Sequence, residues 1–168
     1  MRKVGFVGLD KYKLLKCGVT EEQAYNFCRK LMINELKYGE YEFVSGGCKK
    51  KGIDTICERI ADELGLKKTI IMSEVEEWDD AVEYINIPSE NSLDAHDTEM
   101  IVKKGYKTRN IEIASIIDKL YCVVVRTKGQ YCYHHRDKDV GNTHMVTGAC
   151  YTMRVAKEKG KEVYLVFV

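Results

Sequence analysis

The chain lacks a net charge that would guide it to a charged partner. Its 27 Lys and Arg residues are almost balanced by 26 Asp and Glu residues, which leaves a formal charge of +1. Proteins that bind nucleic acid or anionic membranes through an overall field carry a clear positive excess. We therefore expect any contact with a polyanion to be local, and nucleic acid is not the favoured partner.

Long hydrophobic runs and a secretory signal are also missing. The basic start is followed only by the short apolar segment 4–9 before Asp10, and nothing approaches the ~20 apolar residues that a membrane span requires. The sequence therefore predicts a cytoplasmic protein with no membrane partner. With 168 residues, 45% of them hydrophobic, the chain is long enough for one domain with its own core.

The seven cysteines do not form the pairs that disulfides or metal sites use. Their odd number and scattered positions favour reduced thiols, and no C-x-x-C pair is present. Thiols and imidazoles do gather late in the chain, at Cys132, His134, His135, His144 and Cys150. Zinc uses these ligand types, but Cys132 and His134 are closer in sequence than usual ligand pairs. We therefore predict polar loop residues here, with no metal and no cofactor, and a structural zinc site is the alternative.

Extended apolar runs alternate with amphipathic helical patterns, as is typical of a sheet covered by helices. We expect strands at residues 4–9, 41–45, 69–72, 122–125 and 163–168. Capping-box pairs at Thr20 with Gln23 and at Thr55 with Glu58 predict the starts of two helices. Two more helices are predicted by apolar stripes at Ile113, Ile116, Ile117 and Leu120, and at Cys150, Met153 and Ala156 before Gly160. The continuous Val and Ile runs of the last two strands are typical of parallel strands buried on both faces. The sequence thus predicts one α/β Rossmann-like three-layer domain over residues 1–168, with a mostly parallel sheet.

The middle of the chain is strongly acidic. It holds the only proline, Pro88, and no Lys or Arg between residues 74 and 99, where ten carboxylates occur: Glu74, Glu76, Glu77, Asp79, Asp80, Glu83, Glu90, Asp94, Asp97 and Glu99. A charged segment of this kind is typical of a surface excursion. We predict an insertion or lid at about residues 74–107 on the ligand side of the sheet, with one short helix.

A glycine-rich turn follows the second predicted strand. In open parallel sheets, ligands bind beyond the carboxyl ends of the strands. Glycines let backbone amides approach an anion, and the start of the next helix and the lysines 49–51 add positive charge. Candidate phosphate-binding residues of this turn are Ser45, Gly46, Gly47, Cys48, Gly52, Asp54 and Thr55. A flexible turn with solvated lysines is the alternative for this segment. For Asp54, which could also orient the loop, a helix cap is the preferred interpretation.

A second candidate turn opens the last helix, at residues 147–152. Its small residues and hydroxyls suit a phosphate or ribose oxygen, and Arg109 and Asn110 precede the penultimate helix, where an arginine can clamp an anion. The candidates are Gly8 at the end of the first strand, Arg109, Asn110, Gly148, Ala149, Cys150 and Thr152. Thr147 could instead be an ordinary N-cap, and Arg109 could pair with the acidic segment. Tyr131 and Tyr151 are candidates for stacking on a base, with packing as the default.

Several known motifs are absent. No G-x-G-x-x-G follows the first predicted strand, so a dinucleotide dehydrogenase is not supported. Gly47 and Gly52 match the spacing of a P-loop, but Ile53 and Asp54 stand where Lys and Ser or Thr belong.

Cys48 and Cys150, each near a predicted helix start, could be reactive thiolates. Because neither has an identifiable partner base, packing is the preferred interpretation.

Taken together, these pieces resemble the SLOG superfamily, the Rossmann-like nucleotide-binding domains that include DNA-processing protein A and the Lonely Guy phosphoribohydrolases. Residues 45–54 resemble the group's S-G-x-A-x-G-I-D turn, with two extra residues among the lysines. Arg109-Asn110, with the apolar helix and the strand 122–125 that follow, resembles its R-N…D-x-x-x-V stretch. Residues 147–152 resemble its S-G-G-C-W-T or G-S-x-x-T turn. The resemblance spans residues 3–168 in the right order, and it implies a nucleotide pocket with phosphate held by the 45–47 and 148–152 turns.

Two differences from the SLOG motifs reduce the number of functions that the resemblance implies. Its phosphoribohydrolases carry P-G-G-x-G-T-x-x-E, but residues 153–156 here contain no carboxylate. Its DNA-binding relatives use basic surface, whereas an acidic segment lies here on the expected ligand side. The leading hypothesis is therefore binding of a nucleotide or nucleotide-derived ligand, for sensing or sequestration. The alternatives are a nucleotide N-glycoside hydrolase or transferase, which would use a carboxylate from 74–99, and a DNA-binding module. Because related domains often pair through helices that flank the pocket, a homodimer is a further expectation.

Overall fold

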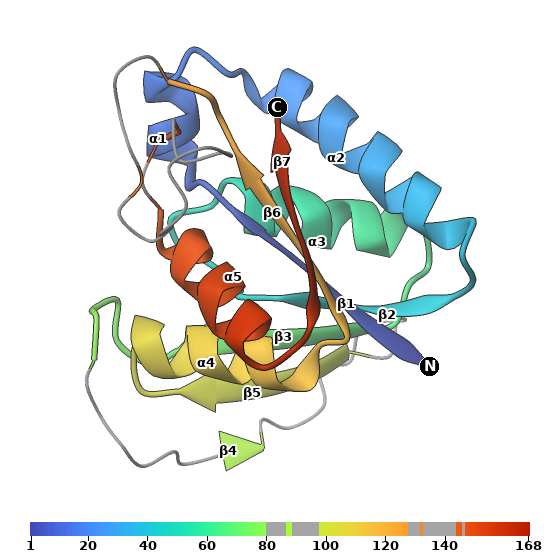
Figure 1. The fold of residues 1–168 in the computed structure, drawn as a ribbon, viewed down its shortest axis with the longest axis vertical. Helices are drawn as coiled ribbons and strands as arrows, with labels where there is room; N and C mark the ends of the chain where they lie inside the picture. The colour runs from blue at the N-terminus through green and yellow to red at the C-terminus, as the bar shows by residue number, and fades with distance from the viewer. Residues whose placement is uncertain (80–86, 89–97, 128–131, 133–143, 146) are drawn as a thin grey trace.

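A seven-stranded sheet forms the centre of the molecule (Figure 1). The computed structural model describes residues 1–79, 87–88, 98–127, 132, 144–145 and 147–168. The strand order is β4-β5-β3-β2-β1-β6-β7. The strands are β1 (Arg2–Gly8), β2 (Tyr41–Ser45), β3 (Lys68–Ser73), β4 (Ile87–Pro88), β5 (Thr98–Lys103), β6 (Lys119–Val124) and β7 (Glu162–Phe167). All pairs are parallel except that of β4 with β5 at the edge.

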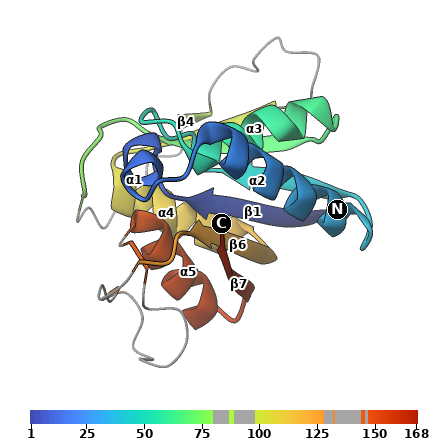
Figure 2. The same ribbon diagram turned by 90° about the horizontal axis from the view of Figure 1, so that it is seen from above.

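Helices cover both faces of this sheet. They are α1 (Lys11–Lys16), α2 (Glu21–Leu36), α3 (Ile53–Glu63), α4 (Tyr106–Ile116) and α5 (Gly148–Glu158). Seen along the sheet, α2 and α3 lie on one face and α4 and α5 on the other (Figure 2). The predicted α/β Rossmann-like three-layer fold with a mostly parallel sheet is thus confirmed. Among the described residues, no helix is long and apolar enough to span a bilayer.

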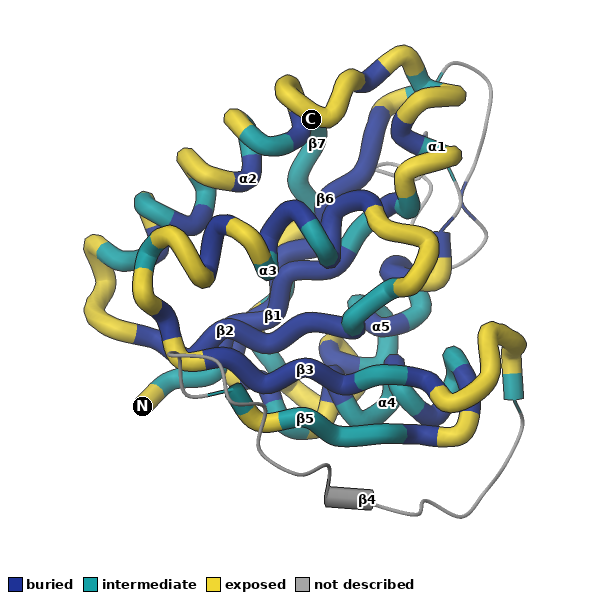
Figure 3. The backbone as a smooth tube through the Cα atoms, turned by 180° about the vertical axis from the view of Figure 1, so that it is seen from behind, coloured by how far each residue is buried: buried dark blue, intermediate teal, exposed yellow. Residues whose placement is uncertain are grey.

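Strand β1 lies in the middle of the sheet because its residues are apolar on both sides. Val4 and Phe6 are fully buried in the core beneath α2 and α3, whereas Val7 packs into the core beneath α4 and α5. Figure 3 shows the inner strands as buried along most of their length. Burial on both faces explains the continuous apolar run of β6, which is buried along its whole length. The same expectation is wrong for β7, which lies at the edge of the sheet and is only partly buried.

The two predicted capping boxes have different outcomes. At α2 the prediction is confirmed: the Thr20 hydroxyl accepts from the amide of Gln23 at 3.2 Å, and the Gln23 side chain accepts from the amide of Thr20 at 2.9 Å. At α3 it is wrong, because the helix begins at Ile53 after Gly52. Thr55 is already inside the first turn, where its hydroxyl donates to the Gly52 carbonyl at 3.3 Å.

The acidic segment contains a strand that the sequence pattern did not reveal. Residues 98–103, part of the predicted 74–107 insertion, form β5, which pairs in parallel with β3 along its whole length. Helix α4 then starts at Tyr106, so β5 and the start of α4 occupy the end of the predicted 74–107 range. The hydrophobicity pattern did not predict β5 because charged residues flank its apolar centre, Met100, Ile101 and Val102. The rest of the predicted lid falls largely on residues outside the described part.

Two smaller differences concern element boundaries. Leu120, expected on the penultimate helix, belongs to β6, because α4 ends at Ile116 and the chain turns at Asp118. Helix α1 was not predicted from the sequence, and its single buried residue, Leu14, explains why no apolar stripe was visible. Both features bear on the site, since α1 and α4 supply side chains to it.

Candidate functional site

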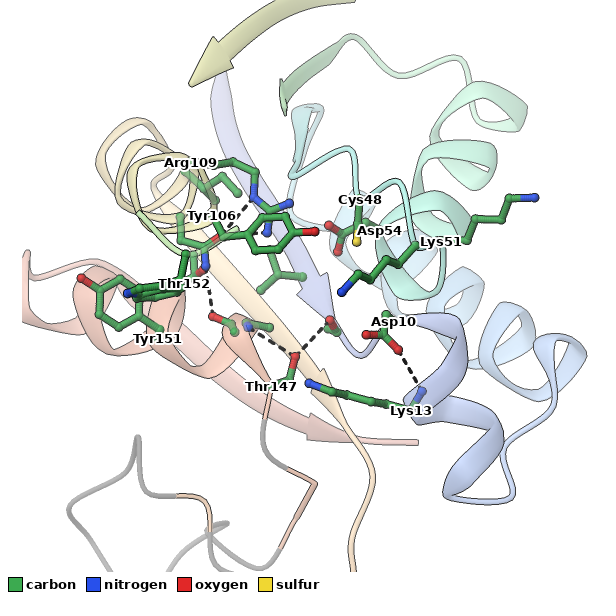
Figure 4. A pocket seen from close by; sticks show the side chains of 18 of the residues that line it. Asp10, Lys13, Cys48, Lys51, Asp54, Tyr106, Arg109, Thr147, Tyr151 and Thr152 are labelled. Carbon is green, nitrogen blue, oxygen red and sulfur yellow. Dashed lines mark hydrogen bonds between the residues drawn. The ribbon is translucent and has the colours of Figure 1, made fainter. Parts of the chain in front are cut away.

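A cavity of about 580 Å³ lies beyond the carboxyl ends of the strands (Figure 4). Its floor includes Val7 and Gly8, the last residues of β1. Since β2 pairs with one edge of β1 and β6 with the other, this is the place where the chain reverses its order across the sheet. Open α/β sheets bind ligands in the crevice at that point.

The residues predicted for the site divide into two groups. Those that line the cavity are Gly8, Cys48, Asp54, Arg109, Asn110, Gly148, Ala149 and Thr152. Those that do not are Ser45, Gly46, Gly47, Gly52, Thr55 and Cys150. Residues of both predicted turns therefore border one cavity, but the first turn reaches it through its later part.

The start of the first turn is used for internal contacts. The buried hydroxyl of Ser45 donates to Oε1 of Glu58 at 2.6 Å and accepts from the amide of Gly47 at 3.2 Å. The carbonyl of Gly46 accepts from Arg109. Beyond these residues, Cys48, Lys50 and Lys51 border the cavity. The turn thus presents lysine side chains to a ligand, while its Ser-Gly-Gly start joins α3 and α4.

Gly52 is required by the backbone and not by a ligand. Its φ of 103° is in the region that favours glycine, and a Cβ there would overlap the backbone of Leu9 and Asp10. This close approach lets the amide of Ile53 donate to the carbonyl of Leu9 at 3.0 Å. Gly52 therefore joins the start of α3 to the end of β1.

Asp54 is a buried carboxyl at the cavity wall. It receives a hydrogen bond from the backbone amide of Gly8 and lies next to the guanidinium of Arg109. Burial raises the pKa of Asp54 to about 6, and Arg109 opposes that rise. The capping interpretation of Asp54 is wrong, because it makes no cap hydrogen bond to α3.

Arg109 and Asn110 connect the two turns. Arg109 donates to the Gly46 carbonyl at 3.3 Å, and its Nε and the other terminal nitrogen donate to Oδ1 of Asn110 at 3.1 and 3.0 Å. The buried amide of Asn110 donates in turn to the Gly148 carbonyl at 3.3 Å. Among the described residues, no carboxylate of the acidic segment forms an ion pair with Arg109. Its guanidinium is instead held at the cavity wall, 4.9 Å from the ring centroid of Tyr106.

The second turn presents its main chain to the cavity. Thr147 is the N-cap of α5, as one interpretation predicted, because its hydroxyl accepts from the amide of Ala149 at 3.4 Å. Gly148 follows, and a Cβ there would meet only the Asn110 side chain, at 3.6 Å. Gly148, Ala149 and Thr152 form one wall of the cavity at the positive end of α5.

The pKa values of the two cysteines near helix starts are both raised, which favours the protonated thiol. Burial, followed by the nearby Asp54 charge, raises the pKa of Cys48. A hydrogen bond with Cys122 is the main cause that raises the pKa of Cys150. Cys150 is fully buried and its Sγ lies 3.2 Å from Nε2 of His144, which explains why it does not reach the cavity.

Several lining residues were not candidates in the sequence. Asp10 and Lys13 come from the start of α1, and Trp78, Tyr106 and Arg154 also border the cavity. The rings of Trp78 and Tyr151 meet edge to face with centroids 4.8 Å apart. The only sequence signal was the position of Asp10 directly after the first strand, where an N-cap residue starts a helix.

The cavity is positively charged although the chain as a whole is nearly neutral. Five cationic side chains line it (Lys13, Lys50, Lys51, Arg109 and Arg154), against the carboxylates Asp10 and Asp54. In Figure 4, Lys13, Lys51 and Arg109 approach the cavity from different elements. Three aromatic side chains, Trp78, Tyr106 and Tyr151, complete the lining. This combination can bind an anion and an aromatic ring together.

The acidic segment does not place a described carboxylate in the cavity. Five of its ten carboxylates are on described residues, and none of these five lines the cavity. Asp79 has a structural role instead, because its Oδ1 accepts from the amides of Lys107 and Thr108 at 2.9 and 3.2 Å. It thereby satisfies the first turn of α4, the helix that carries Arg109.

Comparison with known proteins shows a similarity of fold. No family model and no curated protein matches the chain. Among solved structures, the chain is similar to TM1055, a structural-genomics target, with a TM-score of 0.59 and 14% identity over 97% of this chain and 72% of that one. It is also similar to DNA processing protein A (DprA) from Streptococcus pneumoniae, with a TM-score of 0.58 and 18% identity over 98% of this chain. The match spans only 50% of the DprA chain. At 14% and 18% identity, these similarities concern the fold, and they agree with the Rossmann-like arrangement of the present chain.

Proposed function

We propose that the cavity binds a nucleotide or a nucleotide-derived ligand. The observation that carries this proposal is the convergence of five cationic and three aromatic side chains on one cavity, in a chain whose formal charge is only +1. A nucleotide offers both an anionic and an aromatic part. The cavity volume of about 580 Å³ is also typical of small-molecule sites.

The phosphate would lie between Arg109 and the start of α5. Arg109 is pre-organised by its bonds to Asn110 and Gly46, so little side-chain entropy is lost when it binds an anion. Gly148 and Ala149 line the same side of the cavity, where the positive end of the α5 dipole favours an anion. Three lysines, at positions 13, 50 and 51, also line the cavity and add positive charge around this position.

The base would stack against the aromatic side of the cavity. Trp78 and Tyr151 form an edge-to-face pair, and Arg154 lies 5.2 Å from the ring centroid of Tyr151. An aromatic base has a π-face that such rings bind with little preference for sequence or identity. The aromatic contacts therefore support a nucleotide over inorganic phosphate.

Calorimetry with the full chain tests this proposal. The panel contains mononucleotides, cyclic nucleotides, ADP-ribose and inorganic phosphate. We expect at least one nucleotide to bind more tightly than phosphate, and Arg109→Ala and Lys13→Ala to weaken that binding. Arg59→Ala is the matched control, since Arg59 is an exposed arginine that does not line the cavity. Failure of every nucleotide to bind, or equal weakening in the control, would contradict the proposal.

A second candidate function is cleavage or transfer at the N-glycosidic bond of the nucleotide. One observation favours it: the Asp54 carboxyl lines the cavity and has a pKa raised to about 6, close to the range in which a general acid works best. Asp54 would take the role that the sequence assigned to the 74–99 segment. Release of free base by the wild-type chain, lost in Asp54→Asn with nucleotide binding retained, is the expected result. No free base after prolonged incubation would exclude this function.

Two further expectations from the sequence stay predictions. DprA is named as a DNA-processing protein, and a DNA-binding role would show as oligonucleotide binding with a steep dependence on salt. The near-neutral charge of the chain makes that outcome the less favoured one. A homodimer is checked by analytical ultracentrifugation of the full chain, where a single monomeric species would contradict it.

A further inference from the structure

Two thiols and an imidazole lie together behind the start of α5. The ligand atoms of Cys132, His144 and Cys150 are all within 4.8 Å of one another. All three residues are buried, with at most 1% of their surface exposed. From this cluster we infer that Cys132, His144 and Cys150 form a binding site for one divalent zinc ion.

The geometry of the cluster is close to that of a zinc site. Zn–S bonds of about 2.3 Å and Zn–N bonds of about 2.0 Å in a tetrahedron place the ligand atoms roughly 3.6–3.8 Å apart. Nε2 of His144 lies 3.2 Å from Sγ of Cys150, and the remaining pairs are within 4.8 Å. Shifts of about an ångström would therefore bring the three atoms onto one ion.

The chemistry of the donors selects zinc over harder cations. Thiolate and imidazole are soft or borderline ligands, whereas calcium and magnesium prefer oxygen. When two thiols lose their protons, their charges balance a divalent cation, so the site is neutral inside an apolar core. The protons go to solvent as the metal binds.

The ligands come from two parts of the fold, the connection between β6 and α5 and the start of α5. His144 forms a backbone bridge with Arg126 just after β6, and Cys150 is in the first turn of α5. Cys122 of β6 hydrogen-bonds to the Cys150 thiol but is not part of the cluster. His134 and His135, which the sequence grouped with these residues, are outside the described part of the chain.

The sequence disfavoured a metal site because the cysteines and histidines are not spaced like usual zinc-ligand pairs. That spacing is informative only where both ligands of a pair lie on one structural element. Here the connection between β6 and α5 contributes Cys132 and His144, and α5 contributes Cys150. A bound ion would clamp the connection to the first turn of α5, next to Gly148 and Ala149 at the cavity. The inference does not depend on nucleotide binding, because metal content is measured without any nucleotide.

Metal analysis of the purified full chain under reducing conditions tests the inference. After dialysis against metal-free buffer, we expect about one zinc per chain by mass spectrometry of elements, and loss of that zinc in Cys132→Ser, Cys150→Ser and His144→Ala. Cys57→Ser is the matched control: Cys57 is equally buried and hydrogen-bonded to another thiol, Cys28, but it is not part of the metal-ligand cluster. It should keep its zinc.

A titration of the metal-stripped wild-type chain with Co²⁺ covers the case in which the variants fail to fold. A tetrahedral thiolate site gives intense visible absorption with cobalt, and stoichiometric Zn²⁺ should abolish it. Absence of both bound zinc and the cobalt spectrum would overturn the inference. So would a Cys132–Cys150 disulfide in protein that has no metal, or equal zinc loss in Cys57→Ser.

Discussion

The two glycine-containing turns, at residues 45–55 and 147–152, are similar in sequence but have different structural roles. In the first turn, Gly52 has a positive φ and lies against the backbone of Leu9 and Asp10, so its glycine serves the packing of α3 onto β1. In the second turn, Gly148 has only the Asn110 side chain nearby and lines the cavity. A glycine can therefore indicate close approach of the chain to itself or of a ligand to the chain, and the neighbouring atoms decide which.

The comparison extends to the side chains of the two turns. The first turn offers Lys50 and Lys51 to the cavity, while its start is consumed by contacts with Glu58 and Arg109. The second offers backbone at Gly148 and Ala149. The first turn thus contributes charged side chains and the second contributes residues at the positive end of α5. Arg109 and Asn110 connect the two turns through hydrogen bonds to Gly46 and Gly148.

The largest expected effect concerns the packing glycine. Gly52→Ala should lower the free energy of unfolding by about 3 kcal/mol, because it combines a strained φ with overpacking against fixed backbone. Chemical denaturation followed by circular dichroism measures it. A loss below about 1 kcal/mol would show that the first turn tolerates a side chain there, and the distinction between the turns would fail.

The buried carboxyl of the first turn should make stability depend on pH. Because the folded pKa of Asp54 is raised from 3.8 to about 6, its contribution to stability is fully present below 3.8 and is lost as the pH rises through about 6. The loss amounts to ~2–3 kcal/mol. Asp54→Asn should abolish that loss.

Denaturation curves between pH 4 and pH 8 compare the Asp54→Asn variant with the wild type. Burial also raises the pKa of Glu58, to about 7, so Glu58→Gln should remove a second slope of the same sign at slightly higher pH. Identical pH profiles for the wild type and Asp54→Asn would mean that Asp54 is not held in the environment described here.

Arg109 belongs to both turns, and its removal should affect binding more than folding. Arg109→Ala is expected to weaken nucleotide binding by roughly tenfold to a hundredfold, since a hydrogen bond to a charged group contributes ~1.5–3 kcal/mol. Arg109→Lys should recover only part of the affinity, because lysine lacks the planar fork. Calorimetry gives the affinity and thermal melting confirms folding. If Arg109→Lys recovers the full nucleotide affinity, the loss in Arg109→Ala is due to the missing charge alone.

The smallest expected effect on stability is at the second glycine. Gly148→Ala should change the free energy of unfolding by less than about 0.5 kcal/mol, because its Cβ meets no close neighbour. It should still weaken nucleotide binding severalfold by placing a methyl group in the cavity. If Gly148→Ala leaves nucleotide binding unchanged and Gly52→Ala abolishes it, then the first turn, and not the second, has its glycine at the ligand.

The local patterns of the chain were sufficient for most of the fold. The strand at 41–45, the Thr20 capping box and the α5 start after Thr147 each depend on neighbouring residues, and all three were predicted correctly. Strand β5 was missed because its charged ends resemble the acidic segment before it, although β3 supplies a full set of backbone partners. Helix α1 was missed because one buried leucine leaves no periodic signal.

The sequence alone determined the order of most strands and helices, without α1 and β5, and the presence of two turns rich in small residues. These features depend on local periodicity and on glycine and hydroxyl chemistry. The tertiary structure decided which turn residues reach the cavity and that α1 and residues 78, 106 and 154 join them. It also brought Cys132, His144 and Cys150 together. These contacts join residues far apart in the chain or on separate elements, and only packing across the sheet determines their distances.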